Sequence, residues 1–172
     1  ILVNDMTGEA YMEFKQFHEH PLDKGLKVIE NGSLSHLITS HYAAPLMIEQ
    51  KRGLIVEVTD GIGYEPRTFN FYYDLEKVIN VRLAQSLARQ LTKYKISVVS
   101  VTPGFLRSES MLDHFNVTEE NWKDGVKHQK DFIYSESPFY IGKAVVALAC
   151  DRKIMSKTGK SFVSGKLARD YG

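Results

Sequence analysis

The sequence predicts an α/β fold built on a parallel β-sheet. Short apolar runs rich in β-branched residues alternate with long segments whose apolar residues recur at helical spacing. Strands separated by helices of ten or more residues pair in parallel, with right-handed crossovers and helices on the faces of the sheet. The chain of 172 residues, 43% apolar and 25% charged, fits one ordinary soluble domain over 1–172.

The N-terminal part is expected to form a strand and then a long helix. Ile1 to Val3 is a short apolar run closed by Asn4-Asp5, which is typical of a buried strand that ends in a turn. From Pro21 to about Gln50 an apolar stripe recurs at helical spacing, and the proline suits a first helical turn. Asn31-Gly32 is expected to weaken this helix locally.

A second strand and a second long helix follow. The run from Leu54 to Val58 is rich in β-branched residues and predicts a strand. Glycine, proline and asparagine predict a loop over 61–70. An amphipathic helix is expected over 71–93, where Ala84 and Ala88 would let another element approach closely.

The last third begins with a strand from Ile96 to Val101, which Pro103-Gly104 ends. A mixed polar and aromatic stretch then runs to Glu136. Ser137-Pro138 predicts the start of a helix through Ala149, and 161–163 is expected to be a short final strand.

Charge and cysteine content exclude several classes of partner. With 22 basic and 21 acidic residues the net charge is +1, so we expect neither nucleic acid nor a membrane surface as a partner. No apolar run approaches the roughly 20 residues that span a bilayer. The lone Cys150 cannot form an internal disulfide, and we expect a cytoplasmic protein. The histidines form no metal motif, so no metal is proposed.

Candidate site residues gather where strands are expected to end, since ligands of open α/β sheets bind at that edge. These positions are Asn4, Thr59-Asp60 and Pro103-Gly104. Tyr73 and Lys77 lie four residues apart at the start of the second long helix and therefore share one face. A neighbouring ammonium favours a phenolate, which makes the two residues a candidate proton-transfer pair. Tyr11-Lys15 has the same spacing but no such place in the fold.

The segments GLIVEVTDG, FYYDLEK, VINVRLAQSLARQLTKYKISVVSVTPGFLRSE and TGKSFVSG resemble the short-chain dehydrogenase/reductase family over nearly the whole chain. The C-terminal segment of the chain is similar to the branch of this family that contains dehydrogenase/reductase family member one. The resemblance implies a Rossmann-like, doubly wound parallel sheet that is incomplete at the N-terminus, because the family's GxxxGxG turn and first βα units are absent. It also implies NAD or NADP as the cofactor, and the chain as given is not expected to be active alone.

Position by position, the resemblance makes Tyr73 the catalytic acid/base and Lys77 the residue that lowers its pKa and binds the nicotinamide ribose. The family's serine falls at Thr59 or Asp60, neither of which is serine. Thr59 is preferred because an ionised aspartate cannot donate a hydrogen bond. Asp60 is then a turn residue.

The family's helix asparagine, which supports a proton relay, corresponds most nearly to Asn31. Registering backwards from Ala44-Pro45 instead places Gly32 there, a rotation of about 100°. The relay is then altered, or Asn31-Gly32 only relaxes the helix; both readings stay open.

The resemblance further implies cofactor contacts at Asn4, Pro103, Gly104 and Ser108. It makes 105–136 a substrate lid, although its aromatic residues could equally form a satellite core. A homodimer or homotetramer is expected on the two long helices.

The function expected is hydride transfer between nicotinamide and a small carbonyl or alcohol substrate. The alternative is a non-catalytic family member that acts as a binding or oligomerisation module, because the serine is absent and the asparagine is displaced.

Overall fold

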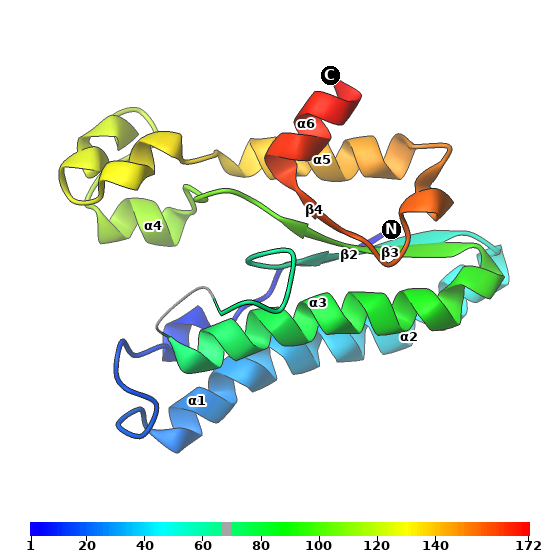
Figure 1. Cartoon of the computed structure of the whole chain (residues 1–172), viewed down its shortest axis with the longest axis horizontal. Coiled ribbons are helices and arrows are strands. Elements are labelled where there is room, and N and C mark those ends of the chain that lie inside the picture. Colours follow the sequence, from blue (N-terminus) through cyan, green and yellow to red (C-terminus); the bar gives the residue numbers. More distant parts are fainter. Residues whose placement is uncertain (67–69) are drawn as a thin grey trace. The chain divides into compact units, whose positions relative to one another are not determined.

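The computed structural model describes residues 1–66 and 70–172, and within them it has a four-stranded sheet in the order β1-β2-β3-β4 (Figure 1). The strands are β1 (Leu2–Asn4), β2 (Gly53–Val58), β3 (Ile96–Thr102) and β4 (Ser161–Val163). β2 pairs in parallel with both β1 and β3. The predicted α/β class with a parallel sheet is therefore confirmed. Part of the predicted loop over 61–70, residues 67–69, lies outside the described residues.

The described chain divides into two compact units. The first consists of Ile1–Thr102 and Asp151–Phe162, and the second of Pro103–Cys150 and Val163–Gly172. The candidate catalytic residues lie in the first unit, whereas Pro103, Gly104 and Ser108 lie in the second.

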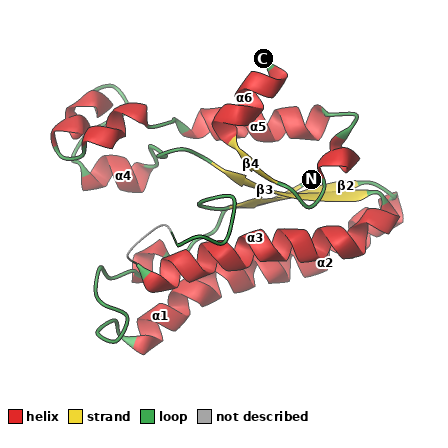
Figure 2. Cartoon of the chain, in the orientation of Figure 1, coloured by secondary structure: helices red, strands yellow, loops and turns green. Residues whose placement is uncertain are grey.

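Two helices of the first unit, α2 (Ser35–Gln50) and α3 (Phe71–Leu91), lie along one face of β1 to β3 (Figure 2). The shorter α1 (Leu22–Ile29) packs against α3. The single helix expected from Pro21 to Gln50 is divided by a π-helical turn at Glu30–Leu34. This turn contains Asn31-Gly32, where the sequence predicted a weak point. Such turns are rare and occur frequently at functional sites.

The core of the first unit lies between α3 and the sheet. Ala84 and Ala88 are buried and pack with Ile55, Ile96 and Val98 from β2 and β3. The expectation that Ala84 and Ala88 let another element approach closely is confirmed, and that element is the sheet of the same chain, so these two alanines are not available to a second subunit. The residues of β3 are all buried, as is typical of strands in parallel sheets whose faces are covered.

The second unit contains α4 (Glu109–His114), α5 (Pro138–Cys150) and α6 (Ser164–Tyr171). α5 agrees with the helix predicted from Ser137-Pro138, whereas α6 was not predicted. Within 105–136 the ring of Phe132 lies 4.7 Å from that of Phe115 and 5.2 Å from that of Phe105. These aromatic side chains form a small core of their own.

Candidate functional site

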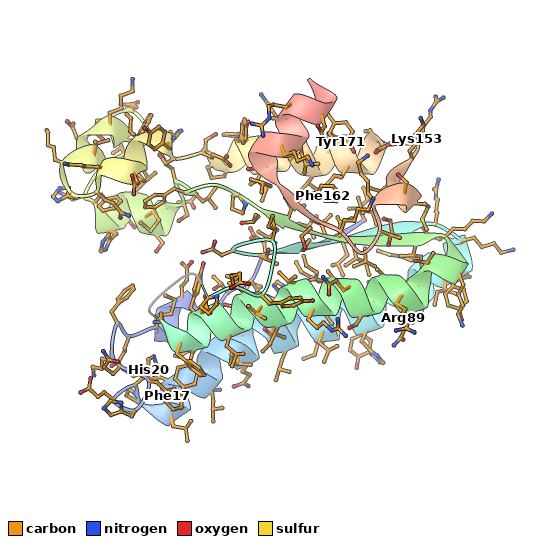
Figure 3. The ribbon with its side chains drawn as sticks, in the orientation of Figure 1. Phe17, His20, Arg89, Lys153, Phe162 and Tyr171 are labelled. Atoms are coloured by element: carbon orange, nitrogen blue, oxygen red, sulfur yellow. The ribbon has the colours of Figure 1, made fainter. Side chains whose placement is uncertain are left out.

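The site is built around the first turn of α3. Asn70 caps this helix: its side chain accepts a hydrogen bond from the Tyr73 N–H at 3.1 Å, and its amide donates to the backbone carbonyl of Glu13, far earlier in the chain, at 3.0 Å. The buried ring of Tyr72 lies 6.0 Å from that of Phe17 and 4.8 Å from that of His20. Figure 3 labels Phe17 and His20 near α1. These contacts fix the start of α3 and therefore the position of Tyr73.

Tyr73 and Lys77 stand one helical turn apart on one side of α3, as their spacing predicts. The Nζ atom of Lys77 lies 5.0 Å from the centroid of the Tyr73 ring. The Lys77 side chain is 11% exposed. The structure thus brings a phenol and a largely buried ammonium together near the end of β2.

The surroundings of Tyr73 favour its neutral form. Burial raises the pKa of Tyr73 most, and the negative charges of Asp60, Glu9 and Glu76 and a hydrogen bond with the Asp60 side chain raise it further. The pKa of Tyr73 is therefore raised in this structure, because burial and the neighbouring carboxylates both disfavour the phenolate. The expected lowering of this pKa by Lys77 stays a prediction.

Thr59 and Asp60, directly after β2, have different roles. The buried Thr59 hydroxyl donates to the Gly61 carbonyl at 3.0 Å, and the Gly61 N–H donates to Thr102 Oγ1 at 3.0 Å. Gly61 has a φ of 93°, a conformation that favours glycine. Thr59 thus closes this turn, while Asp60 interacts with Tyr73. The serine-like role of Thr59 stays a prediction, and Asp60 is the residue of the two that interacts with Tyr73.

A buried carboxylate that the sequence did not single out lies next to Lys77. Glu76 Oε1 is 3.2 Å from Lys77 Nζ and accepts from Asn80 Nδ2 at 3.1 Å. Glu76 Oε2 accepts from the Thr7 hydroxyl at 3.2 Å. Burial raises the pKa of Glu76, while Lys77, Thr7 and His36 oppose that rise. A glutamate directly before a lysine in a helix usually lies on the exposed face of that helix. The sequence therefore carried no clear signal that Glu76 is buried beside Lys77.

The π-helical turn places Gly32 against this glutamate. A Cβ on Gly32 would lie 2.3 Å from Glu76 Cδ, so no larger residue fits without a shift. Asn31 lies one position away, is half-buried, and its backbone carbonyl accepts from the Ser35 hydroxyl. The relay role of Asn31 stays a prediction.

Asn4 belongs to a buried polar network at the end of β1. Its amide donates to Glu57 Oε1 at 2.9 Å and to Ser40 Oγ at 3.1 Å. Glu57 Oε2 lies 2.7 Å from His36 Nδ1, and His36 Nε2 lies 3.0 Å from the Met6 carbonyl. A carbonyl only accepts, so Nε2 is the ring nitrogen that donates to Met6, and Nδ1 faces the carboxylate. Glu57 lies inside the apolar run of β2, and a charged residue at such a position was the sequence feature that could have indicated a buried polar network.

In the second unit, the expected cofactor contacts bond within their own loops. The Gly104 N–H donates to Glu136 Oε2 at 3.0 Å. The Ser108 side chain caps α4 by accepting from the Met111 N–H at 3.3 Å. Pro103 is half-buried at the start of this unit.

Arg107 connects the parts of the 105–136 segment. Its guanidinium lies 4.2 Å from the centroid of the Trp122 ring and donates to the Ser135 carbonyl at 2.6 Å. It also pairs with Glu119 at 2.7 Å and lowers the pKa of that carboxyl. This side chain therefore stabilises the loop arrangement of the segment.

Comparison with known proteins shows relatives over most of the chain. Residues 1–119 match the family model of the short chain dehydrogenases. The chain is 37% identical over 160 residues to "Dehydrogenase/reductase SDR family member 1" of Mus musculus and 35% identical over 160 residues to that of Homo sapiens. Each alignment covers 92% of this chain and 50% of the relative. The chain thus spans about half the length of the curated relatives it matches.

Solved dehydrogenase structures have a similar fold. 4-Hydroxyisoleucine dehydrogenase complexed with NADH matches with a TM-score of 0.71 at 22% identity, covering 94% of this chain and 65% of that chain. Acetoin dehydrogenase from Enterobacter cloacae matches with a TM-score of 0.72 at 25% identity, covering 94% and 61%. Among the described residues, no helix combines the length and the apolar character needed to cross a bilayer.

Proposed function

Because this chain belongs to the short-chain dehydrogenase/reductase family, we propose that the intact protein is an NAD(P)-dependent oxidoreductase. The proposed reaction transfers a hydride between nicotinamide and the carbon of a small carbonyl or alcohol substrate. The observation that carries the proposal is the Tyr73–Lys77 pair, with Nζ 5.0 Å from the ring centroid near the end of β2. This edge of an open parallel sheet is where ligands bind.

In the first unit, the ammonium of Lys77 offers hydrogen-bond donors that suit a ribose. An ammonium has three N–H groups, and the ion pair with Glu76 uses one of them. The others suit the hydroxyls of a nicotinamide ribose, as the resemblance implies. Asn4 would act indirectly by holding the turn after β1, since its amide bonds inside the fold.

The cofactor contacts proposed for the second unit are Pro103, Gly104 and Ser108. Segment 105–136 is proposed as the substrate lid, with Arg107 stabilising it. NAD and NADP are both kept as candidates.

Tyr73 is proposed to exchange a proton with the substrate oxygen. When bound, the cofactor supplies or accepts the hydride. The phenol is protonated at neutral pH and can donate during carbonyl reduction, although its raised pKa makes it a weaker acid. Asp60 would orient the phenol hydroxyl, Thr59 would keep Asp60 in place through its turn, and Asn31 would serve the proton relay.

A specific observation also supports the second candidate, a non-catalytic family member. A carboxylate at Asp60 interacts with Tyr73 and opposes its ionisation, where a hydroxyl donor was expected. A binding or oligomerisation module would tolerate this arrangement.

Turnover measurements separate the two candidates. We expect the intact protein to oxidise NADH or NADPH in the presence of at least one member of a panel of aldehydes and ketones. We expect Lys77→Ala to weaken both turnover and dinucleotide affinity. Dinucleotide binding without turnover of any carbonyl or alcohol would favour the non-catalytic candidate.

We also propose a homodimer or homotetramer and a cytoplasmic location. The exposed apolar side chains of α2 support self-association: Leu37, Ile38, Tyr42 and Leu46. On α3, Val78, Ile79 and Leu83 line a shallow cavity of about 400 Å³. Light scattering that shows only monomer at micromolar concentration would contradict the oligomer.

A further inference from the structure

Gly32 and Glu76 share one space between the π-helical turn and α3. A Cβ on Gly32 would lie 2.3 Å from Cδ and 2.5 Å from Oε1 of Glu76. The Ser33 hydroxyl donates to the backbone carbonyl of Glu76 at 3.2 Å and ties the turn to this part of α3. The glycine therefore makes room for a carboxylate that enters from α3.

The carboxylate in this space faces Lys77. Oε1 is 3.2 Å from Nζ, and hydrogen bonds from Asn80 and Thr7 fix the carboxylate in place. The side chain of Glu76 is 0% exposed and that of Lys77 is 11% exposed. Because a buried ammonium without a counter-charge is costly, this pairing determines where Lys77 lies.

We propose that Glu76 is a positioning residue for Lys77, and that it keeps the ammonium beside Tyr73 by using the space that Gly32 leaves open. The consequence for a dinucleotide rests on the proposed function, in which Lys77 binds its ribose. The other charged groups near the pair are Asp5 from the turn after β1 and His36 from α2. Asp5 acts on Lys77 through its charge and is exposed, so Asp5→Asn is the matched control.

The first test needs no cofactor. The intact protein is trace-labelled with acetic anhydride at pH 8, and acetylation of Lys77 is measured by mass spectrometry relative to the exposed Lys95. Loss of a charged hydrogen bond is expected to raise the labelling rate of Lys77 about 10-fold or more in Glu76→Gln. Asp5→Asn is expected to stay within about twofold, since charge at a wet surface is screened. An unchanged rate in Glu76→Gln would overturn the proposal.

A second test asks whether Gly32 and Glu76 occupy one shared space, and it distinguishes their steric conflict from a general loss of stability. Gly32→Ala should lower the melting temperature, because its Cβ meets the Glu76 side chain. Adding Glu76→Ala removes the atoms in conflict, so the double variant should melt above Gly32→Ala alone. If the two substitutions lowered the melting temperature additively, the proposal that Gly32 and Glu76 share one space would be overturned.

The third test links the pair to the proposed function. NADH and NADPH titrations of the intact protein, followed by fluorescence, should show about 10-fold weaker binding in Glu76→Gln and little change in Asp5→Asn. If the unaltered protein binds neither dinucleotide, the proposed function fails, while the labelling result still decides the role of Glu76. Unchanged affinity together with faster labelling would overturn the cofactor role of the pair.

Discussion

Replacing His36 with alanine tests the buried network that holds Asn4 and the turn after β1. His36 is 1% exposed and Glu57 is 0% exposed, so neither group has water as a substitute partner. The substitution removes the Nδ1 contact of 2.7 Å to Glu57 and the Nε2 hydrogen bond of 3.0 Å to Met6. Glu57 keeps only the donors of Asn4 and Ser40.

The expected magnitude follows from this geometry. Removing one partner of a buried pair costs about 3–5 kcal/mol, because the other charge stays buried without compensation. Domains of this size lose roughly 2–4 °C of melting temperature per kcal/mol. We therefore expect His36→Ala to melt roughly 6–20 °C below the unaltered protein.

The assay is urea and thermal unfolding of the intact protein followed by circular dichroism. His41→Ala is the control, because His41 lies exposed on the same helix and should change stability by no more than about 0.5 kcal/mol. A loss of less than about 1 kcal/mol in His36→Ala, with the same dependence on urea, would refute the reasoning.

Two further predictions concern the other buried and paired charges. Glu76 has a raised pKa in the fold, so the native state holds its proton more tightly than the unfolded chain, and its contribution to stability is present below about pH 4.5 and falls as pH rises through the raised value. Urea unfolding should therefore show that the stability of the parent minus that of Glu76→Gln decreases from pH 4.5 to pH 7, and an increase would contradict this assignment. Arg107→Ala should speed hydrogen exchange across 105–136 because it removes the Trp122, Glu119 and Ser135 contacts together. Exchange as slow as in the parent would show that the segment does not depend on this side chain.

The sequence predicts the main strands and long helices because each has a strong local pattern. β2 and β3 combine β-branched residues with glycine or proline at a boundary, and α3 combines helical periodicity with an asparagine cap at its start. α6 was not predicted because Ser164-Gly165 follows β4 directly and has the composition of a turn.

The site could be predicted only in part. The spacing of Tyr73 and Lys77 predicts that they share one helix face, but choosing them over Tyr11-Lys15 required their place after the second strand and the family resemblance. The pairing of Glu76 with the space at Gly32 depends on two segments far apart in the chain, and no local pattern shows such a contact. The raised pKa of Tyr73 could not be predicted from the sequence, because it depends on burial and on three carboxylates that only the fold brings near the phenol.

The most direct test of the central claim compares Tyr73→Phe with Tyr11→Phe in the intact protein, by steady-state oxidation of NADH and NADPH with a carbonyl substrate. Tyr11 is 39% exposed, and its neighbour Lys15 pairs with Glu13 at 2.6 Å, so this variant controls for the loss of a phenol elsewhere. We expect Tyr73→Phe to lower turnover by about 10² to 10⁴ with dinucleotide affinity retained, and Tyr11→Phe to stay within a few-fold of the parent. Equal losses in the two variants, or no loss in Tyr73→Phe, would contradict the assignment of Tyr73 as the proton-transfer residue.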